Sequence, residues 1–392
     1  MAQKQQKLKP LKAKAFVDKQ REEAVAKKKY WLRLTRACNN NCLFCLDKEI
    51  QNGQMVPLKE VLSELKKGRR QNFKQVILSG GEPTIHPEFL AIVNEARKNG
   101  FDRIQVITNG RMFSYEDFLR QAIAGGVNEI TFSLHGHNEK LHDLQTGIKG
   151  SFCQAIKALQ NALSFPGLIV NVDIVINKIN CRYLSDILRF YIDLGVREFD
   201  LLQVVPFGSA WKNRRRLFYD INKALPHLQK AFSLAREKNA LIWTNRLPPI
   251  YLEKFEELIQ HPDKLYDEIR GRNDMFVKFI KKGEMMECRG ERCKHCFLAG
   301  FCEDLEILRE KGEARAKNIP ACLRKKVAVS EKHSIKMGNV KNICDFLKFF
   351  IDFRYFLKGS ECQKCIFNIN CEGMRCNYIR QHGFKSLKPI KK

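Results

Sequence analysis

The chain of 392 residues is 44% hydrophobic and 10% aromatic, which is enough apolar material for one large core and an accessory domain. This composition excludes a disordered chain, and the absence of an apolar run of about 18 residues excludes a transmembrane helix. The N-terminal residues lack the apolar stretch of a secretory signal, so we expect a cytoplasmic protein with reduced thiols.

The sequence is strongly basic, with a formal net charge of +27, and it contains 15 cysteines. Residues 1–29 and 308–341 each contain ten Lys and Arg against three Asp and Glu, and residues 212–216 read KNRRR. Charge runs of this kind usually form solvated surfaces, and the alternative is docking of an anionic partner such as nucleic acid or an acidic peptide. In a reducing compartment, this many cysteines indicates metal ligation before disulfides.

After a basic arm at residues 1–29, short β-branched runs alternate with amphipathic stretches up to residue 215. Strands are predicted at residues 31–35, 75–79, 103–108, 129–134, 168–175 and 199–205, with helices at 57–68, 87–100, 115–126, 151–165 and 183–195. This alternation predicts βαβ units around a parallel sheet. Six units suit a partial or complete α/β barrel of the TIM type, in which chemistry lies at the C-terminal ends of the strands.

Two further segments follow this core region of residues 30–215. Residues 216–283 have a helical pattern and are expected to complete the core, with one short run at 240–244 that could add a strand. From residue 284 to residue 392 cysteines become dense and regular periodicity fades. We therefore expect a boundary near residue 284, followed by a small irregular Cys-rich domain.

The loop after the first predicted strand contains Cys38, Cys42 and Cys45, spaced C-x3-C-x2-C. Three thiolates on one loop can hold three irons of a [4Fe–4S] cube, and the fourth iron is then left without a protein thiolate. An open metal position is what a catalytic site needs. A zinc site and unrelated thiols are the alternatives at this point.

The second predicted strand ends in Gly80, Gly81, Glu82 and Pro83. Glycines allow the backbone to approach a ligand closely, and a glutamate can accept hydrogen bonds from an ammonium group. Both this segment and the three cysteines follow strand ends, so they are expected on the same face of the barrel.

The cysteine triad with Phe44 before its last cysteine, followed by GGEP after the next strand, resembles the radical S-adenosylmethionine (radical SAM) superfamily over roughly residues 30–210. The resemblance implies a partial (β/α)6 barrel and a catalytic [4Fe–4S] cluster. It also implies that the amino and carboxylate groups of S-adenosylmethionine chelate the open iron.

Individual positions follow from the same resemblance. Phe44 and the backbone near Val205 would face the adenine, and Gly80, Gly81, Glu82 and Pro83 would lie at the amino group of the cofactor. Asn109 and Ser133 stand at the ends of the third and fourth strands, where this family contacts the cofactor. A turn residue and a capping residue are the ordinary interpretations of Asn109 and Ser133.

The C-terminal part contains ten cysteines, in which two segments align. Residues 293–305 read CKHCFLAGFCEDL and residues 362–374 read CQKCIFNINCEGM, both with the pattern C-x2-C-x5-C-E. Such a repeat is a strong metal signal. The first set is Cys293, Cys296 and Cys302, completed by Cys288, and the second is Cys362, Cys365 and Cys371, completed by Cys376, with Cys322 and Cys344 as further candidates.

The second set is similar to the SPASM extension of the radical SAM superfamily, which carries two auxiliary [4Fe–4S] clusters. This sequence has four residues rather than three before the last cysteine, and a shorter approach before the first. The fourth ligand is therefore open among Cys376, Cys322 and Cys344. Four thiolates can also bind zinc, so one cluster plus zinc, and zinc alone, are the alternatives.

The resemblance implies a radical SAM enzyme that cleaves S-adenosylmethionine and abstracts a hydrogen atom from its substrate. We expect oxidative maturation of a peptide or protein side chain, and modification of RNA or of a small cofactor precursor is the alternative. A non-catalytic iron–sulfur carrier is disfavoured by the intact GGEP segment. The basic surface suits an acidic electron donor such as flavodoxin or ferredoxin, and no membrane partner is expected.

Overall fold

The computed structural model describes residues 29–238, 240–324 and 333–391. Seven parallel strands form one sheet in sequence order, from β1 at one edge to β7 at the other. The strands are β1 (Lys29–Thr35), β2 (Gln75–Gly80), β3 (Arg103–Thr108), β4 (Glu129–Ser133), β5 (Ile169–Ile176), β6 (Glu198–Gln203) and β7 (Leu241–Asn245). The predicted α/β partial barrel is confirmed, and the run at 240–244 forms its seventh strand.

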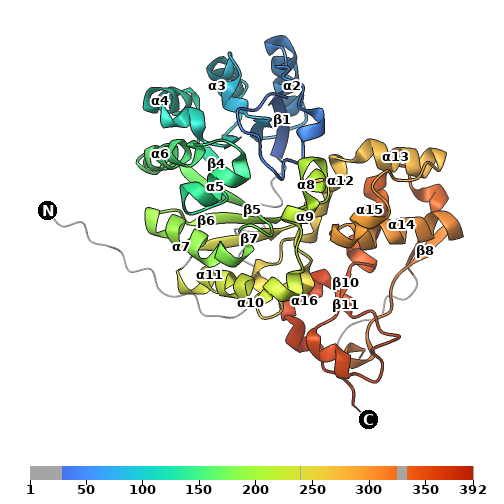
Figure 1. Cartoon of the computed structure of the whole chain (residues 1–392). Coiled ribbons are helices and arrows are strands. Elements are labelled where there is room, and N and C mark those ends of the chain that lie inside the picture. Colours follow the sequence, from blue (N-terminus) through green and yellow to red (C-terminus); the bar gives the residue numbers. More distant parts are fainter. Residues whose placement is uncertain (1–28, 239, 325–332, 392) are drawn as a thin grey trace.

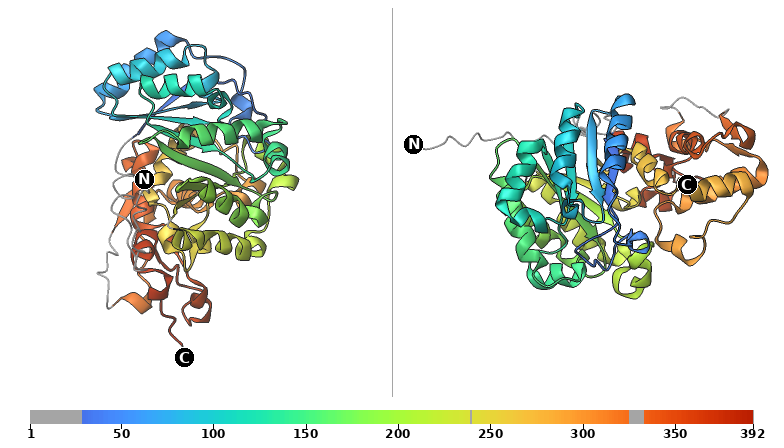
Figure 2. Two further views of the ribbon diagram at one scale, coloured as in Figure 1. Left: turned by 90° about the vertical axis from the view of Figure 1, so that its left-hand side faces the viewer. Right: turned by 90° about the horizontal axis from the view of Figure 1, so that it is seen from above.

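Helices cover one face of this sheet (Figures 1 and 2). They are α2 (Leu58–Arg70), α3 (Phe89–Lys98), α4 (Glu116–Gly125), α5 (Glu139–Thr146), α6 (Ser151–Leu163), α7 (Leu184–Leu194), α10 (Ile221–Phe232) and α11 (Leu234–Glu237). Alternate strand residues such as Val172, Ile174, Phe199 and Leu201 are fully buried in the core between sheet and helices. The residues between them point to the opposite face, here called the inner face of the sheet.

A second core lies beside the barrel (Figure 1). It is formed by α12 (Leu265–Arg270), α13 (Asn273–Lys282), α14 (Ala299–Lys311) and α15 (Ile343–Phe353), around Phe276, Phe301, Phe346 and Phe350. Its first member is Ile269, so this packing unit begins ahead of the boundary expected near residue 284.

The end of the chain returns to the barrel. β10 (Phe356–Leu357), β11 (Met374–Arg375) and α16 (Cys376–His382) contribute Leu357, Met374 and Ile379 to the barrel core. Further short elements are α8 (Gly208–Lys212), α9 (Arg214–Leu217) and the antiparallel pair of β8 (Glu313–Arg315) and β9 (Ser334–Lys336). Within the described ranges, no helix has the length and apolarity needed to span a membrane. The basic arm lies outside the described residues except for Lys29, and so does part of the basic segment 308–341.

Candidate active site

The cysteine triad occupies the loop between β1 and α2. Electrostatic interactions connect the thiol of Cys42 with those of Cys38 and Cys45, so the loop brings the three sulfurs together. Burial raises the pKa of Cys38 to about 11, and it also raises the pKa values of the other two thiols. Buried thiols of this kind become thiolates when a metal replaces their protons.

Two glycines allow the end of β2 to pack directly on the cysteine loop. A Cβ atom on Gly81 would lie 1.9 Å from the carbonyl oxygen of Ala37, and one on Gly80 would lie 2.4 Å from that of Thr35. The Gly81 N–H donates to Thr35 O at 2.9 Å and the Glu82 N–H donates to Ala37 O at 2.8 Å. The glycines therefore position the residue just before Cys38.

The carboxylate of Glu82 connects the loop after β2 with the end of β3. It is 1% exposed, and its Oε1 accepts from the Thr84 and Thr108 hydroxyls at 2.5 and 2.7 Å, while Oε2 accepts from the Asn109 N–H at 2.7 Å. These hydrogen bonds make Glu82 a support of the site. Its Oε2 accepts the hydrogen bond from Asn109 and has room for another donor, so the predicted contact with an amino group stays a prediction.

Asn109 follows β3 and reaches the cysteine loop. Its Nδ2 donates to Asn39 Oδ1 at 2.7 Å, and its side chain also hydrogen-bonds to the thiol of Cys38. The neighbouring Arg111 guanidinium donates to the carbonyl oxygen of Asn39. The expected strand-end residue is therefore adjacent to the triad.

The loop after β6 packs against the cysteine loop at Cys45 and Leu46. A Cβ atom on Gly208 would lie 2.4 Å from the carbonyl oxygens of Cys45 and Leu46, and Ser209 N–H donates to Cys45 O at 2.9 Å. Phe44 packs on a small cluster that includes Val204, next to the predicted Val205, and its ring meets His135 edge-on at 4.5 Å. Phe44 therefore lies near the end of β6, and the adenine-facing role of Phe44 and Val205 stays a prediction.

Two predicted residues show no specific contact with the triad. Ser133 is the last residue of β4 and pairs in register with Asp173 of β5. Pro83 is buried and begins the short 3-10 turn after Glu82.

The site fits an iron–sulfur cluster in its donor chemistry. Among the residues that the structure describes, no three His, Cys, Asp or Glu side chains converge on a single metal ion. The thiolates of a cube bind different irons and lie farther apart than ligands of one ion. Three grouped, half-buried thiols, on a loop against which glycines allow close backbone packing, suit a cluster with one open iron.

A family model described as the radical SAM superfamily matches residues 32–190. The chain carries a radical SAM domain. The match runs from β1 into α7, so it includes the cysteine loop, the GGEP segment and the ends of β3 and β4. This superfamily consists of enzymes that bind a [4Fe–4S] cluster and S-adenosylmethionine.

Two curated relatives are named probable GTP 3′,8-cyclase. The protein of Saccharolobus solfataricus is 27% identical over 178 residues, which are 45% of this chain and 57% of that protein. The protein of Sulfurisphaera tokodaii is 26% identical over 220 residues, which are 56% of this chain and 68% of that protein. The chain thus spans less than two thirds of the length of the first relative.

Solved structures with a similar chain trace include SuiB of Streptococcus suis bound to precursor peptide SuiA. That alignment has a TM-score of 0.49 and 14% identity, and it covers 72% of this chain and 73% of SuiB. Native anSMEcpe with bound AdoMet and Cp18Cys peptide aligns with a TM-score of 0.48 and 14% identity, covering 93% of this chain and 92% of that one.

Beyond the radical SAM domain, the first C-terminal set of cysteines is brought together as its spacing predicted. The thiol of Cys302 interacts electrostatically with those of Cys288, Cys293 and Cys296. Two cations lie beside this group: Arg289 Nη1 is 3.2 Å from the sulfur of Cys293, and Arg272 lowers the pKa of Cys288 against the larger effect of burial. Positive charge here would balance thiolates.

The second C-terminal set has a different fourth member from the one expected first. Cys362 interacts with Cys322, Cys365 and Cys371, and these four line one hollow of about 310 Å³. Cys376 is instead buried at the start of α16 beside Tyr355, and Cys344 lies on α15 near Arg270. Cys322 is 40 positions before Cys362, so local spacing could not identify it.

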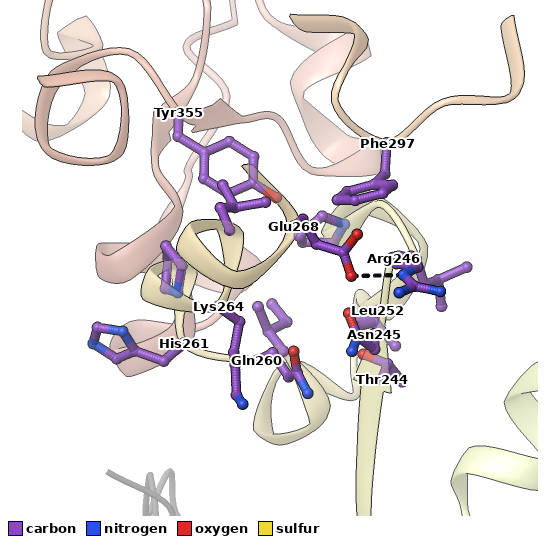
Figure 3. A pocket seen from close by; sticks show the side chains of 15 residues that line it. Thr244, Asn245, Arg246, Leu252, Gln260, His261, Lys264, Glu268, Phe297 and Tyr355 are labelled. Carbon is purple, nitrogen blue, oxygen red and sulfur yellow. Dashed lines mark hydrogen bonds and ion pairs between the residues drawn. The ribbon is translucent and has the colours of Figure 1, made fainter. Parts of the chain in front are cut away.

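A larger hollow of about 460 Å³ lies where β7 ends, between the radical SAM domain and the C-terminal part. Its lining includes Asn245, Lys264 and, from the C-terminal part, Phe297 and Tyr355. Figure 3 shows the Arg246 guanidinium paired with Glu268, at 2.7 Å, on its wall. No sequence pattern indicated this hollow.

Two further residues of the radical SAM domain were missed. Asp173 on β5 and Asp200 on β6 are in-register partners on the inner face. Burial, and for Asp173 also the neighbouring Asp200, raises the pKa of each carboxyl, to about 6 for Asp200. The sequence contained a signal, because each is the one charged residue in its predicted strand, LIVNVDIV and FDLLQVV.

Proposed function

We propose that this chain is a radical SAM enzyme that oxidises a side chain of a peptide or protein substrate. The proposal rests on one observation: Cys38, Cys42 and Cys45 form a group of three, while the two C-terminal groups each contain four thiols. Three thiolates leave one iron of a cube open for a cofactor, whereas four leave none. The group of three therefore suits cofactor binding, and the groups of four suit closed clusters.

When bound, the cofactor supplies a radical: one electron cleaves S-adenosylmethionine into methionine and a 5′-deoxyadenosyl radical, which takes a hydrogen atom from the substrate to give 5′-deoxyadenosine. This chain's own residues hold the site. Gly80, Gly81 and Gly208 allow neighbouring backbone segments to pack closely against the cysteine loop. Glu82 fixes the end of β3 relative to this loop, and Phe44 supplies an apolar wall. Oxidation of the substrate also needs an acceptor for a second electron, and the two four-thiol groups fit that need.

The test is formation of 5′-deoxyadenosine by the reconstituted full chain with dithionite as reductant. Cys38→Ala, Cys42→Ala and Cys45→Ala should each reduce it to background and remove about four irons, the content of one cube. Cys153→Ala is the matched control, because Cys153 is exposed and outside all three groups. Undiminished 5′-deoxyadenosine from any of the three variants would refute the assignment.

A small cofactor precursor is the second candidate substrate, because the curated relatives are named probable GTP 3′,8-cyclase. The two candidates differ in charge, since GTP is a polyanion. Faster 5′-deoxyadenosine formation with GTP would favour this second candidate. Faster 5′-deoxyadenosine formation with a peptide, without acceleration by GTP, would favour the peptide or protein substrate.

A further inference from the structure

The inner face of the sheet carries a pair of carboxylates that the three thiol groups do not involve. Asp173 and Asp200 are directly opposite each other across β5 and β6. Their strand neighbours Val172, Ile174 and Phe199 are fully buried toward the helices, and side chains alternate along a strand. Both carboxyl groups therefore project from the inner face.

This pair is not neutralised by the chain. Other carboxylates around it have close cations: Arg103 lies 2.7 Å from Glu129 and Arg246 lies 2.7 Å from Glu268. Within the part of the chain that the structure describes, no salt bridge reaches Asp173 or Asp200. Lys29 and Arg246 influence Asp173 only at longer range, so no close cation of the described residues neutralises the pair.

Hydrogen-bond acceptors are also left open there. Asp200 Oδ1 is buried and has no hydrogen-bond partner among the described residues, and the same is true of Asn171 Oδ1. Asn171 is 9% exposed and lies two positions before Asp173 on the same face of β5, while its Nδ2 donates to Glu129 Oε1 at 3.0 Å. Buried acceptors of this kind are normally satisfied by a donor, and a ligand that donates hydrogen bonds would supply one.

The pair lies beside the candidate radical site. Two residues beyond Asp173, about 7 Å along the strand, Val175 packs on the cluster that holds Phe44 of the cysteine loop. Ser133, at the end of β4, is the in-register neighbour of Asp173. A group seated at the carboxylates is therefore close to the end of the barrel where the thiols lie.

The hollow at the end of β7 lies next to Asp200, although Asp200 itself does not line it. Asn245 hydrogen-bonds to the Asp200 carboxyl, and Lys264 and Glu268 act on it electrostatically. All three line that hollow (Figure 3). A substrate seated in this hollow would therefore lie near Asp200.

We propose that Asp173, Asp200 and the Asn171 carbonyl form a subsite for a cationic, hydrogen-donating group of the substrate, a primary ammonium or a guanidinium. The inference rests on the proposed function, and it specifies the substrate as one that carries such a group near the hydrogen that is removed. Two buried like charges also raise each other's pKa, and a bound cation relieves that repulsion. The same subsite disfavours a triphosphate.

The test is direct binding to the reconstituted full chain with S-adenosylmethionine bound. The probes are Nα-acetyl-lysine amide, Nα-acetyl-arginine amide, their neutral analogue Nα-acetyl-norleucine amide, and inorganic triphosphate, measured by anaerobic calorimetry or ligand-observed NMR. The lysine or the arginine probe should bind about tenfold more tightly than the norleucine probe. Equal affinities of the charged and neutral probes, or preferred binding of triphosphate, would overturn the inference.

Variants locate the binding. Asp173→Asn and Asp200→Asn should each weaken the charged probe about tenfold and leave the norleucine probe unchanged. Asp193→Asn on the exposed face of α7 is the matched control and should change neither. If a variant does not fold, the comparison of charged and neutral probes on the unaltered chain still decides.

The same samples separate the two proposals. Absence of 5′-deoxyadenosine in the unaltered chain contradicts the proposed function. Normal 5′-deoxyadenosine formation with no preference for the charged probes contradicts the subsite alone.

Discussion

The carboxylate of Glu82 and the backbone N–H of Asn109 are joined by a hydrogen bond of 2.7 Å that connects the loop after β2 with the end of β3. Both residues also reach the cysteine loop, Glu82 through its backbone N–H to Ala37 O and Asn109 through Asn39. Three consecutive strand ends are thereby fixed relative to one another. The position of Cys38 depends on this connection.

Glu82→Gln should weaken this connection. The amide nitrogen cannot accept a hydrogen bond, so a buried donor from Thr84, Thr108 or Asn109 loses its partner at a cost of about 1–3 kcal/mol. We expect a lower free energy of unfolding and weaker binding of S-adenosylmethionine, measured by denaturant titration and calorimetry. Glu88→Gln, on the exposed side of the same segment, is the control. Wild-type values for Glu82→Gln would contradict the supporting role.

Gly81→Ala should disrupt the cysteine loop. Its Cβ atom would lie 1.9 Å from the Ala37 carbonyl oxygen, and backbone atoms cannot move away as a flexible side chain can. We expect a loss of about 3 kcal/mol or more in the free energy of unfolding, together with poor cluster retention. Gly300→Ala is the control, because a Cβ atom there meets nothing within 4 Å, and added helix propensity should raise stability by up to about 1 kcal/mol. Equal stabilities of the two variants would rule out the close packing.

Cys322→Ala and Cys376→Ala should have different effects on metal content. Cys322 lies with Cys362, Cys365 and Cys371, so its removal should reduce the iron from about twelve toward about eight per chain. Cys376 is 1% exposed in the barrel core, so its removal should lower stability by about 1 kcal/mol and leave iron unchanged. Cys344→Ala is a second control. The measurement is iron, sulfide and zinc per chain after anaerobic reconstitution. Loss of metal from Cys376→Ala alone would show that Cys376, and not Cys322, is the fourth thiol of the second set.

Asp200 should make stability depend on pH. Its pKa is raised from 3.8 to about 6, so the folded chain binds this proton more tightly than the unfolded chain. The resulting stabilisation is fully present below the ordinary pKa of 3.8 and is lost as the pH rises from there through about 6. Between about pH 5 and pH 6.5 the free energy of unfolding should fall by about 1 kcal/mol from this group.

Asp200→Asn should remove that slope. The groups that act on Asp200 are Asp173, Lys264, Arg246 and Glu268, with Asn245 as hydrogen-bond donor, and all remain in the variant. Denaturant midpoints of both chains across this pH range provide the measurement. Parallel pH profiles for the two chains would show that Asp200 is not the titrating group.

Much of the barrel could be predicted from the sequence because its strands are buried on the helix side. The predicted runs at 103–108 and 75–79 correspond to β3 and β2 almost residue for residue. Their β-branched composition and bounding turns are local signals. The cysteine loop and GGEP segment could be located for the same reason, since each directly follows a strand.

Other features depend on contacts between distant segments. Cys322 joins Cys362 only through the return of the chain onto the barrel. The hydrogen bonds of Glu82 to Thr108 and Asn109 join residues 26 and 27 positions apart, so the sequence alone could not predict them. The second core begins at Ile269 because α12 and α13 pack on α14 and α15. The amphipathic pattern of α12 and α13 predicts a buried face but does not predict which helices cover it.

The hydrogen bonds around the cysteine loop bear on the order in which the protein matures. Asn41 and Leu43 N–H groups donate to Thr146 and Gln145 of α5 at 2.8 and 2.9 Å, and Asn213 Nδ2 donates to Leu43 O at 3.0 Å. Many small metal sites form only when the metal arrives. Here the conformation of the loop also depends on α5 and Asn213, so we expect the cluster site to be complete only once the barrel has folded.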